Sequence, residues 1–347
     1  MSLINLLTFF IGLALLIFGG GLFVDGASSI ARRFSISELL IGATVVSVGT
    51  TLPEVLVSAS AALSGAGEIA YGNAIGSIIC NTALIAALTI AIKPVSTDGE
   101  ALKIPTLFFF IATAFYIFVS YSIGKFTRLF GVILLLLFIA YMAYTVISMR
   151  RDVILFETAD APDEKKPLDK LPLLTELKEE LLGRRTSIVR EIIILIIGAV
   201  MIAFGADFLV EAAEKIANAL GVSQTLISLT IVALGTSLPE LITAITALIK
   251  GHGALGVGNI IGANLFNLVL VSGVSMLISP FSLPTSTTLL NQNSTLVLDI
   301  PLMVGAMLIL TIPTILKSRL SRWQGVTLLL LYGAFLTVQL IFVSPAM

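Results

Sequence analysis

The chain has 347 residues, of which 57% are hydrophobic and 12% are charged. A soluble domain usually carries about 25% charged residues, so this composition excludes an ordinary soluble domain and favours a protein whose solvent is lipid. The formal net charge of −1 gives no electrostatic footprint for nucleic acid. The one cysteine, Cys80, excludes an internal disulfide framework and a multi-thiol metal site.

Apolar stretches long enough to cross a bilayer, about 20 residues each, recur along the whole chain. In chain order they are residues 3–24, 36–63, 70–92, 104–122, 128–149, 188–210, 222–249, 254–278, 296–316 and 324–344. They are continuous and do not alternate with a period of two, which excludes a membrane β-barrel. We therefore predict an all-α integral membrane protein with ten transmembrane helices.

The basic residues predict how these helices are oriented. With ten helices, all of the 20 Lys and Arg residues except Lys125, Arg128 and Lys215 lie on one side of the membrane. Lys and Arg in short loops favour the cytoplasmic side. We expect a multi-pass plasma-membrane protein with extracellular termini and a cytoplasmic connecting loop at 150–187. The leucine spacing at 171–182 within this loop fits either an amphipathic surface helix or a solvated connector.

The chain contains an internal repeat, which a shift of 186 residues reveals without a gap. The segment Gly49-Thr-Thr-Leu-Pro-Glu54 then aligns with Gly235-Thr-Ser-Leu-Pro-Glu240. Likewise, Gly72-Asn-Ala-Ile-Gly-Ser-Ile-Ile-Cys-Asn81 aligns with Gly258-Asn-Ile-Ile-Gly-Ala-Asn-Leu-Phe-Asn267. The matches fall on Gly, Pro, Thr, Asn and Glu, which contact with lipid does not select, so a repeat kept only for packing explains them poorly.

The repeat divides the chain into two halves joined by the polar loop. The halves are residues 1–149, with the repeated motif at 42–81, and residues 188–347, with the motif at 228–267. Each half has five predicted helices. Because five is odd, the second half enters the membrane from the opposite face. Inverted repeats of this kind are typical of secondary transporters, whose substrate site lies near the midplane between the repeats.

Two acidic residues, Glu54 and Glu240, occupy equivalent positions near the middle of their helices. An ionised side chain at that depth costs several kcal/mol unless it is compensated. No Lys, Arg or His lies at a similar depth, and the single histidine, His252, follows the second acidic helix, where we interpret it as a surface residue. The compensating charge is therefore a bound cation or a proton.

Oxygen-bearing residues accompany both glutamates. Thr50 precedes Glu54 by four residues and shares its helix face, and Ser47 lies one further turn back. Thr236 and Ala233 occupy the corresponding positions before Glu240. Calcium takes six to eight oxygen ligands from carboxylates, carbonyls, amides and water, so this pattern indicates a hard-cation site.

Prolines stand directly before both glutamates. Pro53 and Pro239 lack an N–H group and clash with the carbonyl four residues earlier. We expect each helix to break or kink there and to release backbone oxygens. Irregular backbone at this depth is tolerated only where protein or a cavity covers it.

The helix that follows each glutamate carries further polar residues. Ser77 and Asn81 lie one turn apart, as do Ala263 and Asn267. The asparagines can be ion ligands, which their repetition favours, or they can form interhelical hydrogen bonds. Four glycines spaced by four are expected to allow close helix packing: Gly72, Gly76, Gly258 and Gly262. Asp25 and Glu211 are interpreted as interfacial or entry-path acids, and Asp207 and Asp299 are interpreted as interfacial.

The paired Gly-Thr-Thr/Ser-Leu-Pro-Glu motifs, each followed by Gly-Asn-x-Ile-Gly, resemble the two alpha-repeats of the cation/calcium exchanger superfamily, and the whole chain is similar to its prokaryotic sodium/calcium exchanger branch. The resemblance implies an ion core made of helices 2, 3, 7 and 8. It also implies that helices 1 and 6 slide across this core to switch access.

The resemblance further implies a set of ion ligands and no cofactor. Calcium would be bound by Glu54, Glu240, Thr50 and Thr236. Flanking sodium sites would share the two glutamates and use Ser47, Thr51, Ser77, Asn81, Ala233 through its carbonyl, Ser237 and Asn267. Ala263 and Asn267 depart from the Ser and Asp that archaeal relatives often carry, which leaves the number of sodium ions open.

Three other functions are alternatives to sodium/calcium exchange: a calcium/proton antiporter, a passive channel and an intramembrane enzyme. A calcium/proton antiporter could neutralise the same carboxylates with protons. The hydroxyls beside both glutamates favour sodium, because a proton needs no coordination shell. A passive channel does not require an inverted duplication with paired glutamates. An intramembrane enzyme would need a zinc motif or a nucleophile with a His base, and the sequence contains neither.

Overall fold

The computed structural model describes residues 3–34, 36–159, 188–219, 235–285 and 287–345. Within these ranges nine helices have the length and apolar composition of a membrane span, so the protein is an all-helical, multi-pass membrane protein. The remaining predicted span, 222–249, and the predicted surface helix at 171–182 lie partly or wholly outside the described residues. The described part of the former is helix α12 (Leu238–Lys250).

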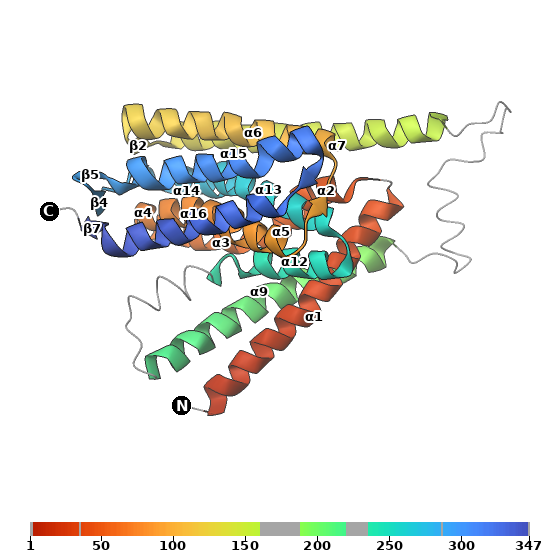
Figure 1. The fold of residues 1–347 in the computed structure, drawn as a ribbon, viewed down its shortest axis with the longest axis horizontal. Helices are drawn as coiled ribbons and strands as arrows, with labels where there is room; N and C mark the ends of the chain where they lie inside the picture. The colour runs from red at the N-terminus through yellow and green to blue at the C-terminus, as the bar shows by residue number, and fades with distance from the viewer. Residues whose placement is uncertain (1–2, 35, 160–187, 220–234, 286, 346–347) are drawn as a thin grey trace.

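The elements of the first half end in the long helix α7, which continues ten residues past the predicted boundary at 149 (Figure 1). In chain order they are α1 (Leu3–Arg33), α2 (Glu38–Ile41), η1 (Gly42–Val46), α3 (Ser47–Leu63), α4 (Gly67–Cys80), η2 (Asn81–Ala86), α5 (Ala87–Ile92), β1 (Val95–Ser96), α6 (Gly99–Phe118), η3 (Val119–Ile123), β2 (Lys125–Phe126) and α7 (Arg128–Ala159).

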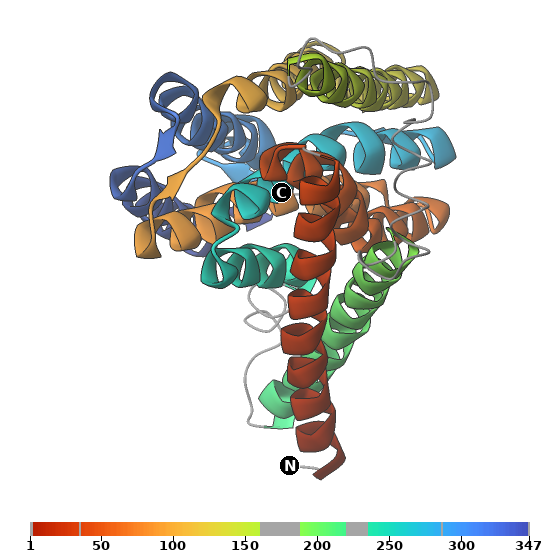
Figure 2. The ribbon, with the colours of Figure 1, turned by 90° about the vertical axis from the view of Figure 1, so that its right-hand side faces the viewer.

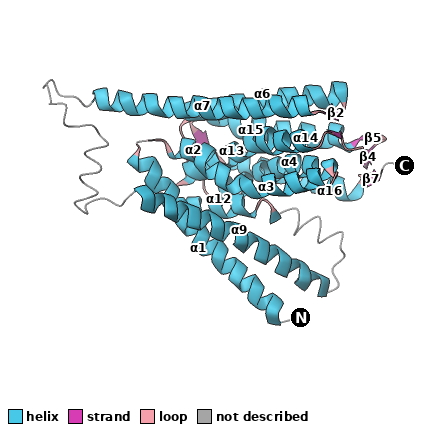
Figure 3. Ribbon diagram, turned by 180° about the vertical axis from the view of Figure 1, so that it is seen from behind, coloured by secondary structure: helices cyan, strands magenta, loops and turns pink. Residues whose placement is uncertain are grey.

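The second half begins with another long helix and ends in a short strand near the C-terminus. Its described elements are α9 (Ile188–Ala219), α12 (Leu238–Lys250), α13 (Gly253–Phe266), η5 (Asn267–Val271), α14 (Ser272–Ile278), β3 (Phe281–Ser282), β4 (Thr287–Leu289), β5 (Gln292–Asn293), η6 (Thr295–Asp299), α15 (Ile300–Lys317), β6 (Arg319–Leu320), α16 (Arg322–Ile341) and β7 (Ser344–Pro345). Figure 3 shows that the strands are short and that helices make up most of the structure.

Three of the long spans contain a π-helical turn between two α-helical parts. The turn η1 joins α2 to α3, Asn81 opens η2 between α4 and α5, and Asn267 opens η5 between α13 and α14. Such turns shift the backbone hydrogen bonds by one residue and are frequent at functional sites. The sequence pattern predicts helix irregularity only at the prolines, so these turns are not expected from it.

The two prolines have different effects on their helices. Helix α3 continues through Pro53 without interruption, so the helix does not end there as a break would require. A proline removes only one donor, and the backbone bonds on both sides can maintain the helix. In the second half, Thr236 and Ser237 form a turn, and α12 begins at Leu238 with Pro239 in its first turn.

Short antiparallel ribbons connect the two halves. Val95 of β1 pairs with Leu320 of β6, and Phe126 of β2 pairs with Phe281 of β3. Each ribbon therefore takes one strand from each half. The helix boundaries also recur at the spacing of the repeat, because α4 and α13 begin 186 residues apart, as do η2 and η5.

Helices α1 and α9 pack closely against each other and lie obliquely to the other helices (Figures 1 and 2). A Cβ atom added at Gly12 would lie 2.7 Å from the backbone nitrogen of Leu209, and one at Gly198 would lie 2.5 Å from the backbone nitrogen of Phe23. Small residues allow this backbone approach, which drives helix association in lipid. At one end of the pair, Arg33 forms a two-pronged ion pair with Glu191.

The helices that carry the repeated motifs lie inside the bundle. In the most apolar window of residues 253–278, 83% of the residues are buried, compared with 17% in α16. Many of the large apolar side chains of α7 and α16 are exposed, as expected for surfaces that face lipid. The buried polar residues of α3, α4, α12 and α13 include Thr50, Thr51, Glu54, Ser77, Glu240 and Asn259.

Candidate ion-binding site

The Glu54 carboxylate from α3 and the Glu240 carboxylate from α12 lie inside the helix bundle. Both side chains are 0% exposed, and they are close enough for their negative charges to repel each other. Within the described residues, neither carboxylate has a hydrogen-bond partner, and no Lys, Arg or His forms an ion pair with it. Buried charges without a protein partner are very costly, so a mobile cation or a proton must balance them.

Other side chains at equivalent positions of the two halves are also buried and have no hydrogen-bond partner among the described residues. Thr51 and Ser237 are buried with unpartnered hydroxyls, and Asn81 and Asn267 are fully buried with both amide atoms unpartnered. Buried polar groups are normally hydrogen-bonded, so a repeated set of exceptions calls for an explanation. These atoms supply the kind of oxygen donors that a hard cation requires.

The asparagines stand where the α-helices change into π turns. Asn81 is the first residue of η2, and Asn267 is the first residue of η5. Ser77 precedes Asn81 by one helical turn and is also buried. At the position equivalent to Ser77, Ala263 is buried but has no hydroxyl, so the two halves differ at this place.

Thr50 and Ser47 already have partners within the protein. Thr50 donates a hydrogen bond to the Asn259 side-chain oxygen at 3.0 Å, and its side chain lies beside Glu240. Ser47 contacts the backbone oxygens of Asn259 and Gly42 at 2.9 and 2.7 Å. The two hydroxyls therefore tie the acid-bearing helix α3 to α13, and each retains oxygen lone pairs.

Two more of the predicted ligands, Thr236 and Ser237, lie directly before α12. Ser237 lies beside the Cys80 side chain of α4, and Thr236 is partly buried in the same turn. Ala233, predicted to act through its carbonyl, lies outside the described residues.

Two asparagines that sequence analysis did not assign to the site contact it directly. Asn259 holds Thr50, and the equivalent Asn73 donates to the Glu54 backbone oxygen at 3.3 Å and to the Ser58 hydroxyl at 2.8 Å. The signal that could have revealed them is the Gly-Asn pair repeated in both halves.

An access cavity of about 470 Å³ opens between α3, α9 and the start of α12. Both prolines line it, together with Gly235 and Thr236. Asp207 of α9 is exposed on its wall. Glu211 also lines it and forms an ion pair with Lys215. The cavity thus reaches the residues next to the glutamates and carries acidic side chains that attract cations.

The other predicted polar residues lie apart from the glutamates. Asp25 forms an ion pair with Lys250 at 2.7 Å, which joins α1 to the end of α12. His252 contacts Glu38 at 2.6 Å and is only 19% exposed, so it is more enclosed than the surface residue we expected. It is not part of the site.

Comparison with known proteins identifies the family of this chain. The sequence profile of the family described as sodium/calcium exchanger protein matches residues 4–147 and 190–341. The chain belongs to the sodium/calcium exchanger family. The profile covers both halves and omits the connecting loop.

Relatives and solved structures extend over nearly the entire chain. The sodium/calcium exchanger MaX1 of Methanosarcina acetivorans is 31% identical, over 97% of this chain and 99% of its own. An uncharacterized membrane protein of Methanocaldococcus jannaschii is 35% identical, over 93% and 94%. A structure of the sodium-calcium exchanger NCX_Mj, soaked with Na⁺ and Sr²⁺, superposes with a TM-score of 0.74 at 33% identity and covers 97% of this chain and 99% of that one.

Family membership identifies the class of ion that suits the unpartnered oxygens. Na⁺ and Ca²⁺ are both hard cations that bind carboxylate, amide, hydroxyl and carbonyl oxygens. The described site offers the first three kinds, and the Pro53 ring leaves the Gly49 carbonyl without its usual helical donor.

Proposed function

We propose that this exchanger is an antiporter that uses the inward Na⁺ gradient to move Ca²⁺ out of the cell by alternating access at a site near the membrane midplane. The observation that carries the proposal is the pair of fully buried carboxylates, Glu54 and Glu240, which have no partner in the described protein. Two negative charges match one Ca²⁺ or two Na⁺, so both ions can occupy the same carboxylates in turn.

We assign to the ligands the roles that the resemblance of the repeated motifs implies. Ca²⁺ binds between the two glutamates, with Thr50 and Thr236 contributing from the turns before them. Na⁺ ions flank this position and share the glutamates. Their further ligands are Ser47, Thr51, Ser77, Asn81, Ala233, Ser237 and Asn267. The buried, unpartnered atoms of Thr51, Ser237, Asn81 and Asn267 support these assignments.

Coupling follows from the cost of burying charge. With the site empty, an occluded intermediate would hold two uncompensated carboxylates, so return of the empty carrier is strongly disfavoured. Either Ca²⁺ or Na⁺ removes this penalty. Because the two ions compete for the same carboxylates, loading one releases the other, and each crossing of the membrane carries an ion.

Alternating access in this scheme depends on two five-helix halves of opposite orientation, residues 1–149 and 188–347. The neighbouring helices α1 and α9, at equivalent positions of the halves, run in opposite directions in Figure 1, which supports an inverted repeat. The glycine-mediated contact between them supports their moving together as one unit across the remaining helices. The access cavity then opens on one face of the membrane at a time.

The test is Na⁺-driven ⁴⁵Ca²⁺ flux in vesicles that contain the purified protein. We expect Glu54→Gln or Glu240→Gln to reduce flux to background, because the amide keeps the shape of the side chain but removes the charge that binds the ion. Glu100→Gln, which changes an exposed acid paired with Lys103, should leave flux unchanged.

The choice of gradient tests which ion drives transport, and this test does not depend on where that ion binds. A Na⁺ gradient alone should drive Ca²⁺ uptake, and a pH gradient without Na⁺ should not. Uptake driven by protons would replace this proposal with a calcium/proton antiporter, and normal flux in either glutamine variant would remove the acid pair from the mechanism.

A further inference from the structure

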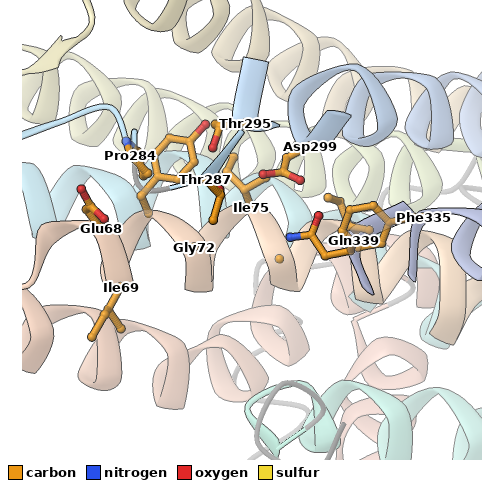
Figure 4. A pocket seen from close by; sticks show the side chains of 13 residues that line it. Glu68, Ile69, Gly72, Ile75, Pro284, Thr287, Thr295, Asp299, Phe335 and Gln339 are labelled. Atoms are coloured by element: carbon orange, nitrogen blue, oxygen red, sulfur yellow. The ribbon is translucent and has the colours of Figure 1, made fainter. Parts of the chain in front are cut away.

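A second cavity, here called the side cavity, lies apart from the two glutamates. It has a volume of about 330 Å³ and is walled by α4, η6, α16 and the segment before β4 (Figure 4). Its polar lining residues are Glu68, Tyr71, Thr287, Thr295, Asp299 and Gln339. None of the residues assigned to the exchange site lines it.

The side cavity exists because the two halves pack differently at equivalent glycines. A Cβ atom at Gly258 would lie 2.1 Å from the Leu39 backbone oxygen, and one at Gly262 would lie 2.3 Å from the Ser47 hydroxyl. The equivalent glycines of the first half, Gly72 and Gly76, would meet nothing within 4 Å. The predicted close packing is thus found in the second half, whereas the prediction is wrong for Gly72 and Gly76, which line the cavity.

Several polar atoms of residues that line the side cavity have no hydrogen-bond partner among the described residues. They are the Tyr71 hydroxyl, one carboxylate oxygen of Asp299 and the amide oxygen of Gln339. Tyr71 is only 2% exposed, and its buried hydroxyl lies beside Ser120. In Figure 4 the side chains of Asp299 and Gln339 point toward each other, while Glu68 lies at the other end of the cavity.

The charge of this cluster determines which ion suits it. The donors are all oxygen atoms, which favour a hard cation over a soft one. Among the described lining residues none is basic and two are acidic. Asp299 has an unpartnered buried oxygen, whereas Glu68 is exposed and lies at the other end of the cavity, so Asp299 is the single carboxylate of the cluster. In surroundings of low dielectric constant, a monovalent cation neutralises a single carboxylate, whereas a divalent cation would leave an excess positive charge.

We propose that the side cavity binds one Na⁺ ion, with the Asp299 carboxylate as its charged ligand and Tyr71 and Gln339 as neutral oxygen donors. The buried Thr295 side chain, next to Asp299, completes the cluster. The ion bridges α4, η6 and α16 and stabilises their packing. This role is separate from ion exchange and does not depend on it.

The experiment measures thermal unfolding of the exchange-inactive double variant Glu54→Gln/Glu240→Gln, so that binding at the exchange site does not contribute. Unfolding is compared in NaCl and in choline chloride at equal ionic strength. Na⁺ should raise the Tm by about 2–4 °C, because a ligand that binds only the folded state stabilises it. Adding Asp299→Asn should abolish this rise.

Two further variants keep the test decisive if Asp299→Asn perturbs folding. Tyr71→Phe removes only the hydroxyl and keeps the ring packed against Tyr116 and Phe126, so the Na⁺ concentration for half-maximal stabilisation should rise several-fold. Glu100→Gln, which changes an exposed acid paired with Lys103 that lines neither cavity, should retain the full effect.

Three outcomes would contradict the proposed Na⁺ site in the side cavity. The proposal fails if Na⁺ and choline give the same Tm in the double variant, or if the Na⁺ effect survives Asp299→Asn. Stabilisation by Ca²⁺ without stabilisation by Na⁺ would contradict the assignment of a monovalent ion. Each of these results leaves the flux measurements of the exchange proposal untouched.

Discussion

At the scale of single residues, Asn259 of the second half is hydrogen-bonded to Thr50 of the first half. Its side-chain oxygen accepts the Thr50 hydrogen bond, while its amide nitrogen has no partner. Thr50 in turn lies beside Glu240. Asn259 therefore positions a proposed Ca²⁺ ligand without being one of the predicted ligands itself.

We expect Asn259→Leu to weaken Ca²⁺ transport by raising the KM for Ca²⁺ several-fold. The change removes a hydrogen bond worth about 1 kcal/mol and frees the Thr50 side chain to turn away from the glutamates. The dependence of Na⁺-driven ⁴⁵Ca²⁺ uptake on Ca²⁺ concentration measures the effect.

Asn264→Leu is the matched control on the same helix. Asn264 is equally buried, but it donates to Thr82 and contacts Met307 rather than the residues beside the glutamates. It should affect stability and leave the KM near its normal value. An equal rise in KM for both variants would show that Asn259 has no special role.

At the scale of elements, the helices that carry equivalent motifs differ in how tightly they pack. Gly258 and Gly262 of α13 pack against the backbone of α2 and η1 and against Ser47, whereas Gly72 and Gly76 of α4 open onto the side cavity. The same sequence pattern thus allows a close helix contact in one half and forms a cavity wall in the other.

Gly262→Ala and Gly76→Ala test this difference at two positions related by the repeat. The methyl group at Gly262 would overlap with Ser47 and the Ala43 backbone, so we expect a loss of stability of about 1–3 kcal/mol, together with reduced exchange. Gly76→Ala should be neutral or slightly stabilising, because alanine favours the helix and the space is open. Thermal unfolding of both variants measures the contrast, and equal Tm values for the two would refute it.

At the scale of the whole molecule, strand pairs and a helix–helix contact join the two halves. The β1·β6 and β2·β3 ribbons each pair one half with the other, and α1 packs along α9. In Figure 1 both termini lie at the end of the bundle opposite the end of α7 and the start of α9. From the positive-inside rule we propose that the opposite end faces the cytoplasm.

This orientation predicts which sites a membrane-impermeant maleimide reaches in intact cells. Cys80, the only native cysteine, is buried and should stay unlabelled. Ser2→Cys and Ala346→Cys should be labelled from outside, because both termini are proposed to be extracellular. Ser187→Cys, in the connecting loop, should be labelled only after the membrane is opened. The reverse pattern would invert the topology.

Much of the architecture was predictable from the sequence because it depends on local properties. The length of each apolar run determined the nine spans found in the described residues, within a few residues at most boundaries. The repeated Gly, Pro, Thr, Asn and Glu positions located both motifs. No basic residue lies near the depth of Glu54 and Glu240 in the sequence, which predicted that a cation or a proton neutralises them. Within the described residues no ion pair involves either glutamate.

Only the tertiary structure decided which polar groups are paired and which glycines are packed. Thr50 is hydrogen-bonded to Asn259, more than 200 positions away, while Thr51, one residue further, has no partner in the part of the chain that the structure describes. Gly262 touches Ser47, but Gly76 borders open space. Hydrogen bonds and packing depend on distances between segments far apart in the chain, and the repeated pattern is the same in both halves, so local sequence could not distinguish these cases.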